Sequence, residues 1–136
     1  MPSPKQRPFV IDCPLRVFER HVVLLVGPVM DATERLAAEK SIIVPRCAIR
    51  EVRAALKRVG DVQGCCVKSY GDVYVWLPVW KSKVVVHELY HATKMVLDFC
   101  AITEDPNNEI GAWIIEHLFH TFCNTKIADL NLRSRK

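Results

Sequence analysis

Two histidines and a glutamate in this chain have the spacing that metal-assisted hydrolysis requires. The segment His87-Glu88-Leu89-Tyr90-His91 is an H-E-x-x-H motif that directly follows the apolar residues 84–86. On a helix, His87 and His91 would share one face, about 6 Å apart along the axis. Both imidazoles could then bind one Zn²⁺ ion at roughly 2.0–2.1 Å, and Glu88 could act as general base on a water molecule beside it.

The residues around the motif favour a helix. No Pro or Gly occurs between residues 82 and 101, and Leu89, Ala92, Val96 and Phe99 recur at helical spacing. The plainer alternative is a buried helix whose histidines are satisfied by ordinary hydrogen bonds. Because two His and a Glu are costly to bury on an apolar helix, we favour the metal site.

A third protein ligand is expected downstream. Residues 103–108 are rich in turn formers, and a second helix is predicted over 108–127, with Asn107 or Asn108 as its N-cap. Glu109 lies in the first turn of this helix and is the first choice of ligand. An ordinary helix-start carboxylate is the alternative. Glu116 and His120 point the same way and could replace Glu109, or could support a ligand or the substrate.

An oxyanion-stabilising group is also needed for hydrolysis of a peptide bond. His117, His120 and Tyr70 are candidates by residue type, and the sequence does not choose between them. A partly exposed side chain without a catalytic role is the stronger reading for His117.

Residues 73–122 resemble a known family. The motif with its following Ala92, the hydrophobic helix, the acidic turn and Glu109-Ile110-Gly111-Ala112-Trp113 are similar to the small zincin-like metallopeptidases of tailed bacteriophages and prophages. The resemblance implies His87, His91 and Glu109 as zinc ligands, Glu88 as general base and a peptide or protein as substrate. The cytoplasm of the host cell is the expected location, because the start of the chain shows no secretory signal and no apolar run is long enough to span a membrane. Gly111 departs from the bulkier residue that is usual there.

A structural role is the rival hypothesis. A zincin-like fold could serve as a neck, tail or head component of a phage particle, with other phage structural proteins as partners, and the protein would then be found in the virion. The short chain of 136 residues leaves little room for substrate subsites, which favours this reading.

The composition sets limits on partners. The net charge of +4 is too small to argue for specific nucleic-acid binding, and no apolar run is long enough to span a membrane. The polar, proline-rich start shows no secretory signal, so the six cysteines are expected to be reduced and mostly buried thiols.

The remaining pattern predicts one α+β domain, a short mixed sheet packed on the motif helix and on a following antiparallel helix. We expect an N-terminal tail over residues 1–8, the domain over 9–127 and a basic tail over 128–136. Strands are predicted at 9–11 and 21–26, and a hairpin at 65–77 around Tyr70-Gly71, with 41–44 as a strand or a connector. Helices are predicted at 31–40, capped by its first residues, and at 45–59. The strand 73–77 is either an ordinary core or edge strand or the edge that pairs with an extended substrate.

Overall fold

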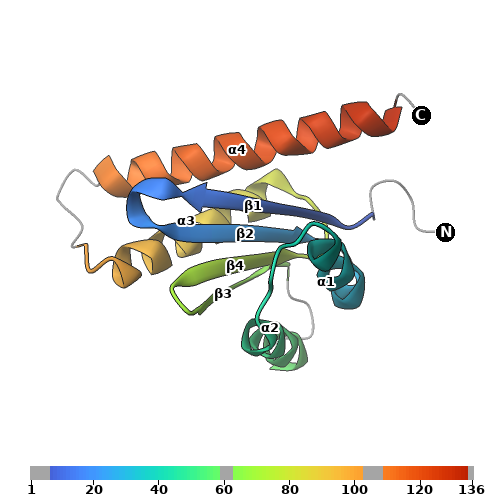
Figure 1. The fold of residues 1–136 in the computed structure, drawn as a ribbon, viewed down its shortest axis with the longest axis horizontal. Coiled ribbons are helices and arrows are strands. Elements are labelled where there is room, and N and C mark those ends of the chain that lie inside the picture. Colours follow the sequence, from blue (N-terminus) through green and yellow to red (C-terminus); the bar gives the residue numbers. More distant parts are fainter. Residues whose placement is uncertain (1–6, 59–62, 103–108, 135–136) are drawn as a thin grey trace.

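The computed structural model describes residues 7–58, 63–102 and 109–134 and contains four strands and four α-helices (Figure 1). A 3-10 turn, Arg16–Phe18, joins the first two strands. In chain order, the elements are β1 Phe9–Leu15, β2 Arg20–Val26, α1 Met30–Glu39, α2 Arg46–Arg58, β3 Cys65–Ser69, β4 Asp72–Leu77, α3 Ser82–Phe99 and α4 Glu109–Ser134.

The four strands form one mixed sheet in the order β1-β2-β4-β3. The outer strands β1 and β3 run antiparallel to their neighbours, whereas the inner pair β2 and β4 is parallel. The parallel pair needs a long crossover, and the chain provides it through α1, α2 and β3. The predicted α+β class with a mixed sheet is confirmed.

The sheet separates two apolar clusters, because successive strand residues point to opposite faces. On one face, α3 and α4 pack on residues such as Val22, Leu24 and Val75. On the other face, α1 and α2 pack on residues such as Val23, Leu25 and Trp76. Figure 1 shows the two helix pairs on opposite sides of the sheet. The sequence predicts only the α3–α4 layer as packing on the sheet.

Several predicted boundaries shift in the structure. β1 extends to Leu15 instead of ending at residue 11, and residues 41–44 form a connector. The predicted side-chain cap of α1 is wrong, because Val29 is the N-cap and Thr33 is buried, donating its hydroxyl to the carbonyl of Met30. α4 continues to Ser134, past the predicted end at residue 127. Residues 1–6, the end of the predicted helix at residue 59, the turn at 103–108 and residues 135–136 lie outside the described residues.

The predicted hairpin is confirmed, with Tyr70 and Gly71 between β3 and β4. Both residues have positive φ, 52° and 85°, as a two-residue turn of the mirror-image type requires. The suggestion that residues 73–77 form a free edge is wrong. β4 lies between β2 and β3 and is almost fully buried, so it is a core strand. The edge on this side of the sheet is β3.

No disulfide joins the six cysteines, all of which lie in described segments. Only Cys13 is fully buried, and the other five are partly buried. In the described part of the chain, no helix is long and apolar enough to cross a membrane.

Candidate metal site

Helix α3 presents the motif with its glutamate facing inward and its histidines facing outward. Its core stripe, which includes Val85, Leu89 and Val96, is fully buried against the sheet and α4. At about 100° per residue, His87 and His91 fall on the far side of the helix from this stripe, and both are exposed. Glu88 lies at the margin of the stripe and is only 7% exposed.

The two imidazoles lie close together, as the i, i+4 spacing predicts. Nε2 of His87 and Nε2 of His91 are 3.2 Å apart, and the ring centroids are 4.8 Å apart. Two nitrogens bound tetrahedrally to one zinc ion at 2.0–2.1 Å would be about 3.3 Å apart. The pair therefore has the separation that a shared zinc ion needs. Without an ion, one ring can donate an N–H to the other.

The Glu88 carboxyl lies against the start of the edge strand β3. A Cβ atom added at Gly64 would come 2.9 Å from Glu88 Cγ and 3.1 Å from Glu88 Oε1. Burial raises the pKa of the Glu88 carboxyl, and the two motif histidines oppose that rise when they are charged. A carboxyl whose pKa lies above its ordinary value holds a proton more readily, which suits it to exchange protons with water.

Two further residues at this place were not identified from the sequence. Gly64 leaves the space that Glu88 occupies, and a larger residue there would also clash with Leu77, whose Cδ2 would be 2.8 Å away. Cys66 is a neighbour on β3, and its Sγ lies 3.6 Å from the Met95 sulfur. Burial, and then the Glu88 charge, raise the pKa of the Cys66 thiol well above its ordinary value. Cys66 is therefore a neutral thiol beside Glu88.

The described residues show no third ligand gathered at the histidine pair. Figure 1 shows α4 beginning at the same end of the molecule at which α3 ends, and His91 lies eight residues before the end of α3, about 12 Å along its axis. Glu109 is exposed, and α4 buries Ile114, Leu118 and Phe122 instead. Among residues 7–58, 63–102 and 109–134, no three His, Cys, Asp or Glu side chains gather closely enough to hold a metal ion. Glu109 as a ligand stays a prediction.

The alternative residues on α4 do share one side of the helix, as their spacing predicts. Glu116 and His120 are exposed, opposite the buried stripe, and His120 Nε2 lies 3.0 Å from Asn124 Nδ2. His117 stacks on Trp113 with ring centroids 5.4 Å apart. Tyr70 is 88% exposed at the tip of the β3–β4 hairpin. Within the described part of the chain, none of the three candidates His117, His120 and Tyr70 has a contact that identifies it as the oxyanion-stabilising group.

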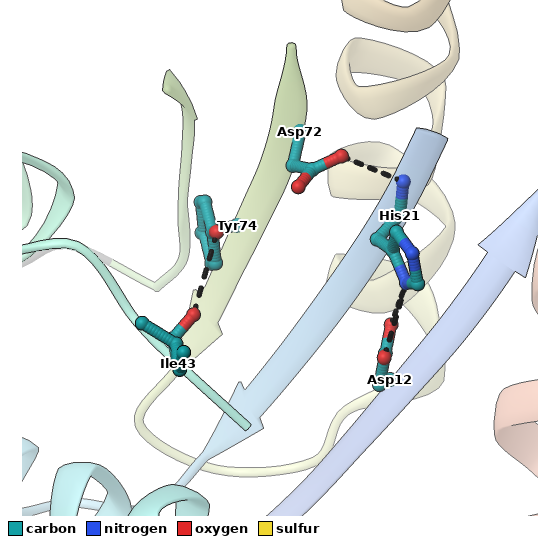
Figure 2. Close-up of polar contacts among 5 residues, drawn as sticks. All are labelled: Asp12, His21, Ile43, Asp72 and Tyr74. Carbon is teal, nitrogen blue, oxygen red and sulfur yellow. Dashed lines mark hydrogen bonds and ion pairs between the residues drawn. The ribbon is translucent and has the colours of Figure 1, made fainter. Parts of the chain in front are cut away.

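A second polar cluster, on the α1–α2 face of the sheet, was also not predicted (Figure 2). The His21 ring lies 2.9 Å from an Asp12 carboxylate oxygen, and the His21 backbone N–H donates to Asp72 at 2.9 Å. The Tyr74 hydroxyl donates to the Ile43 carbonyl at 3.5 Å. Burial, followed by the charges of Asp72 and Asp12, raises the pKa of Tyr74 to about 12. These contacts tie β1, β2 and β4 to the connector before α2.

Comparison of the chain with protein-family models, with curated proteins and with solved structures finds no match.

Proposed function

We propose that the protein is a zinc-dependent peptidase in which His87 and His91 bind the metal and Glu88 is the general base. The observation that supports this most is the histidine pair, because its 3.2 Å Nε2 separation suits one shared ion. The buried Glu88 beside the pair adds a carboxyl with a raised pKa. Glu109 remains the proposed third ligand, on the strength of its sequence context.

The chain supplies distinct functions around this site. A zinc ion held by the two imidazoles would act as a Lewis acid toward water and the scissile carbonyl. Glu88 would accept a proton from the attacking water and return it to the leaving amine. The apolar surroundings of Glu88, formed with Leu77 and Gly64, would keep the carboxyl poorly hydrated, so that it holds a proton more readily than an exposed glutamate.

Metal binding is tested by zinc content and by thermal unfolding. The wild type should bind one zinc ion per chain, and zinc at 100 times its dissociation constant should stabilise the fold by about 2.7 kcal/mol. His91→Ala should lose both effects. Glu109→Ala or, if the alternative ligand is used, Glu116→Ala should weaken binding, whereas Glu39→Ala at an exposed position of α1 is the control and should retain zinc. Equal zinc content in the wild type and His91→Ala would refute the site.

Hydrolysis is tested with Glu88→Gln and a library of unstructured peptides. The variant should retain zinc and lose at least about a hundredfold in turnover, because general base catalysis contributes roughly 10²–10⁴-fold. Glu39→Gln, at an exposed position of α1, is the control and should retain full turnover. Unchanged turnover in Glu88→Gln would rule out this role for Glu88.

The second candidate is a structural component of a phage particle. Val86 and Tyr90 flank the histidines and are 46% and 48% exposed, so the outer face of α3 offers apolar surface to a partner. A fixed copy number in purified particles, without peptide cleavage by the isolated protein, would favour this function. In that case a zinc ion bound by the two histidines would stabilise the contact between α3 and the partner protein.

A further inference from the structure

Helix α2 concentrates positive charge on one side. Its apolar side buries Ala48, Ile49 and Val52 against the sheet. The opposite side carries what we call the basic stripe, and its four members are all exposed: Arg46, Arg50, Arg53 and Lys57. The net charge of only +4 for the whole chain conceals this concentration.

The spacing of the basic stripe is regular. Its members stand at positions i, i+4, i+7 and i+11, which places them within a sector of about 60° around the helix. They extend over about 16 Å along the axis. One strand of B-form DNA presents about five phosphates over that length, at one per 3.4 Å. The length of the basic stripe therefore suits a row of several phosphates rather than a single phosphate group.

The stripe borders a groove of about 310 Å³ between α1 and α2, whose lining includes Arg46, Arg50 and Arg53. Two acidic residues of α1 lie beside it. Asp31 forms an ion pair with Arg53, and Glu34 lines the groove. Within the described residues, neither Arg46 nor Arg50 forms an ion pair with a carboxylate. These two guanidinium groups are therefore available to an external anion.

We propose that the basic stripe of α2 binds the phosphate backbone of a nucleic acid without reading its sequence. Arginine suits this role because its planar guanidinium can donate two parallel hydrogen bonds to a phosphate. An anionic membrane is the less suitable partner. The described side chains of α1 and α2 themselves include no exposed large apolar residue, and the exposed Val29 and Ile43 lie outside these helices, so neither helix offers an amphipathic face for insertion between lipids.

Binding is measured by fluorescence anisotropy with 20-nucleotide DNA, single-stranded and duplex, in EDTA so that the result does not depend on zinc. For the duplex, log Kobs should fall with log salt with a slope of about −3, given about 0.9 per phosphate contact. Arg46→Gln with Arg50→Gln should reduce the slope by about two and weaken binding at least tenfold at low salt. Asp31→Asn releases Arg53 and should strengthen binding.

Matched controls separate this surface from net charge. Arg16→Gln with Lys83→Gln removes two charges from exposed positions outside α1 and α2 and should change affinity less than twofold. Asp98→Asn, an exposed position on α3, is the control for Asp31→Asn. An equal loss in the two double variants, or no binding by the wild type, overturns the proposal. Binding to phosphatidylserine vesicles but not to DNA would overturn it in favour of a membrane.

Discussion

Glu88 illustrates how one side chain can be set apart by its surroundings. The two histidines of the motif are exposed, yet the Glu88 side chain is packed near Gly64 and Leu77. An unpaired buried carboxylate is costly, so the group favours its protonated form. Ionisation of Glu88 therefore lowers the free energy of unfolding at neutral pH, and this loss can be measured without any substrate.

The raised pKa of Glu88 predicts how stability depends on pH. The folded protein holds this proton above the ordinary value of 4.5, where the unfolded chain releases it. The contribution of Glu88 to stability is therefore full below about pH 4.5 and is lost as the pH rises through the folded pKa. Relative to the wild type, Glu88→Gln, which cannot ionise, should gain stability as the pH rises above about 4.5 and through the folded pKa. Urea unfolding in EDTA measures this.

The control for that experiment is Glu39→Gln at an exposed site on α1. Its stability difference from the wild type should stay constant over the same pH range. If Glu88→Gln also shows a constant difference, the Glu88 carboxyl is hydrated in solution. Its assignment as a buried proton carrier would then fail.

At the scale of elements, the turn of the β3–β4 hairpin packs against Arg20, the first residue of β2. Gly71 has φ of 85°, and a Cβ atom there would lie 2.2 Å from Nη1 of Arg20. The Arg20 guanidinium in turn lies 5.6 Å from the centre of the Phe99 ring. The turn, the start of β2 and the end of α3 therefore meet at one point.

Gly71→Ala should destabilise the protein by about 1–3 kcal/mol, because alanine is strained at this φ and would displace Arg20. Urea unfolding measures the change. In an Arg20→Ala background only the backbone strain remains, so the penalty of the same substitution should be smaller. A penalty that is the same in both backgrounds would show that the Arg20 contact contributes nothing.

The sequence predicts most elements because their determinants are local. The apolar spacing of α3, the turn residues Tyr70-Gly71 and the continuous β-branched run of β2 each specify a structure within a few residues. The order of the strands depends on pairing between segments that are distant in the sequence, which local patterns do not reveal. For this reason the sequence allows residues 73–77 to be an edge strand, whereas the structure places β3 at that edge. The same reason leaves Glu109 unresolved as a ligand, since its position depends on how α4 packs rather than on its own turn.

At the scale of the whole molecule, the sheet divides the interior into two apolar layers. The layer under α3 and α4 contains Ile114, Leu118 and Phe122, all fully buried. These three residues form the buried stripe of α4, and the packing of α4 on the sheet and on α3 depends on them. Loss of one of them should weaken the whole layer.

Leu118→Ala should cost about 2–5 kcal/mol in the free energy of unfolding, the range for a large buried residue cut to alanine. Ile110→Ala is the matched control on the same helix, because Ile110 is 42% exposed, and it should cost less than about 1 kcal/mol. Urea unfolding followed by circular dichroism compares them. Similar costs for the two variants would mean that α4 does not pack on the sheet in solution.

The parallel pairing of β2 with β4 has a consequence for how the chain acquires its structure. Val22 and Val73 are register partners although 51 positions separate them, while β1–β2 and β3–β4 are joined by short turns. Closing a long loop costs entropy before any contact compensates for it. We therefore expect contacts within the two hairpins to form before the contacts between them. We expect the docking of β2 along β4 to limit the folding rate, and until it occurs both inner strands can pair with the wrong partner.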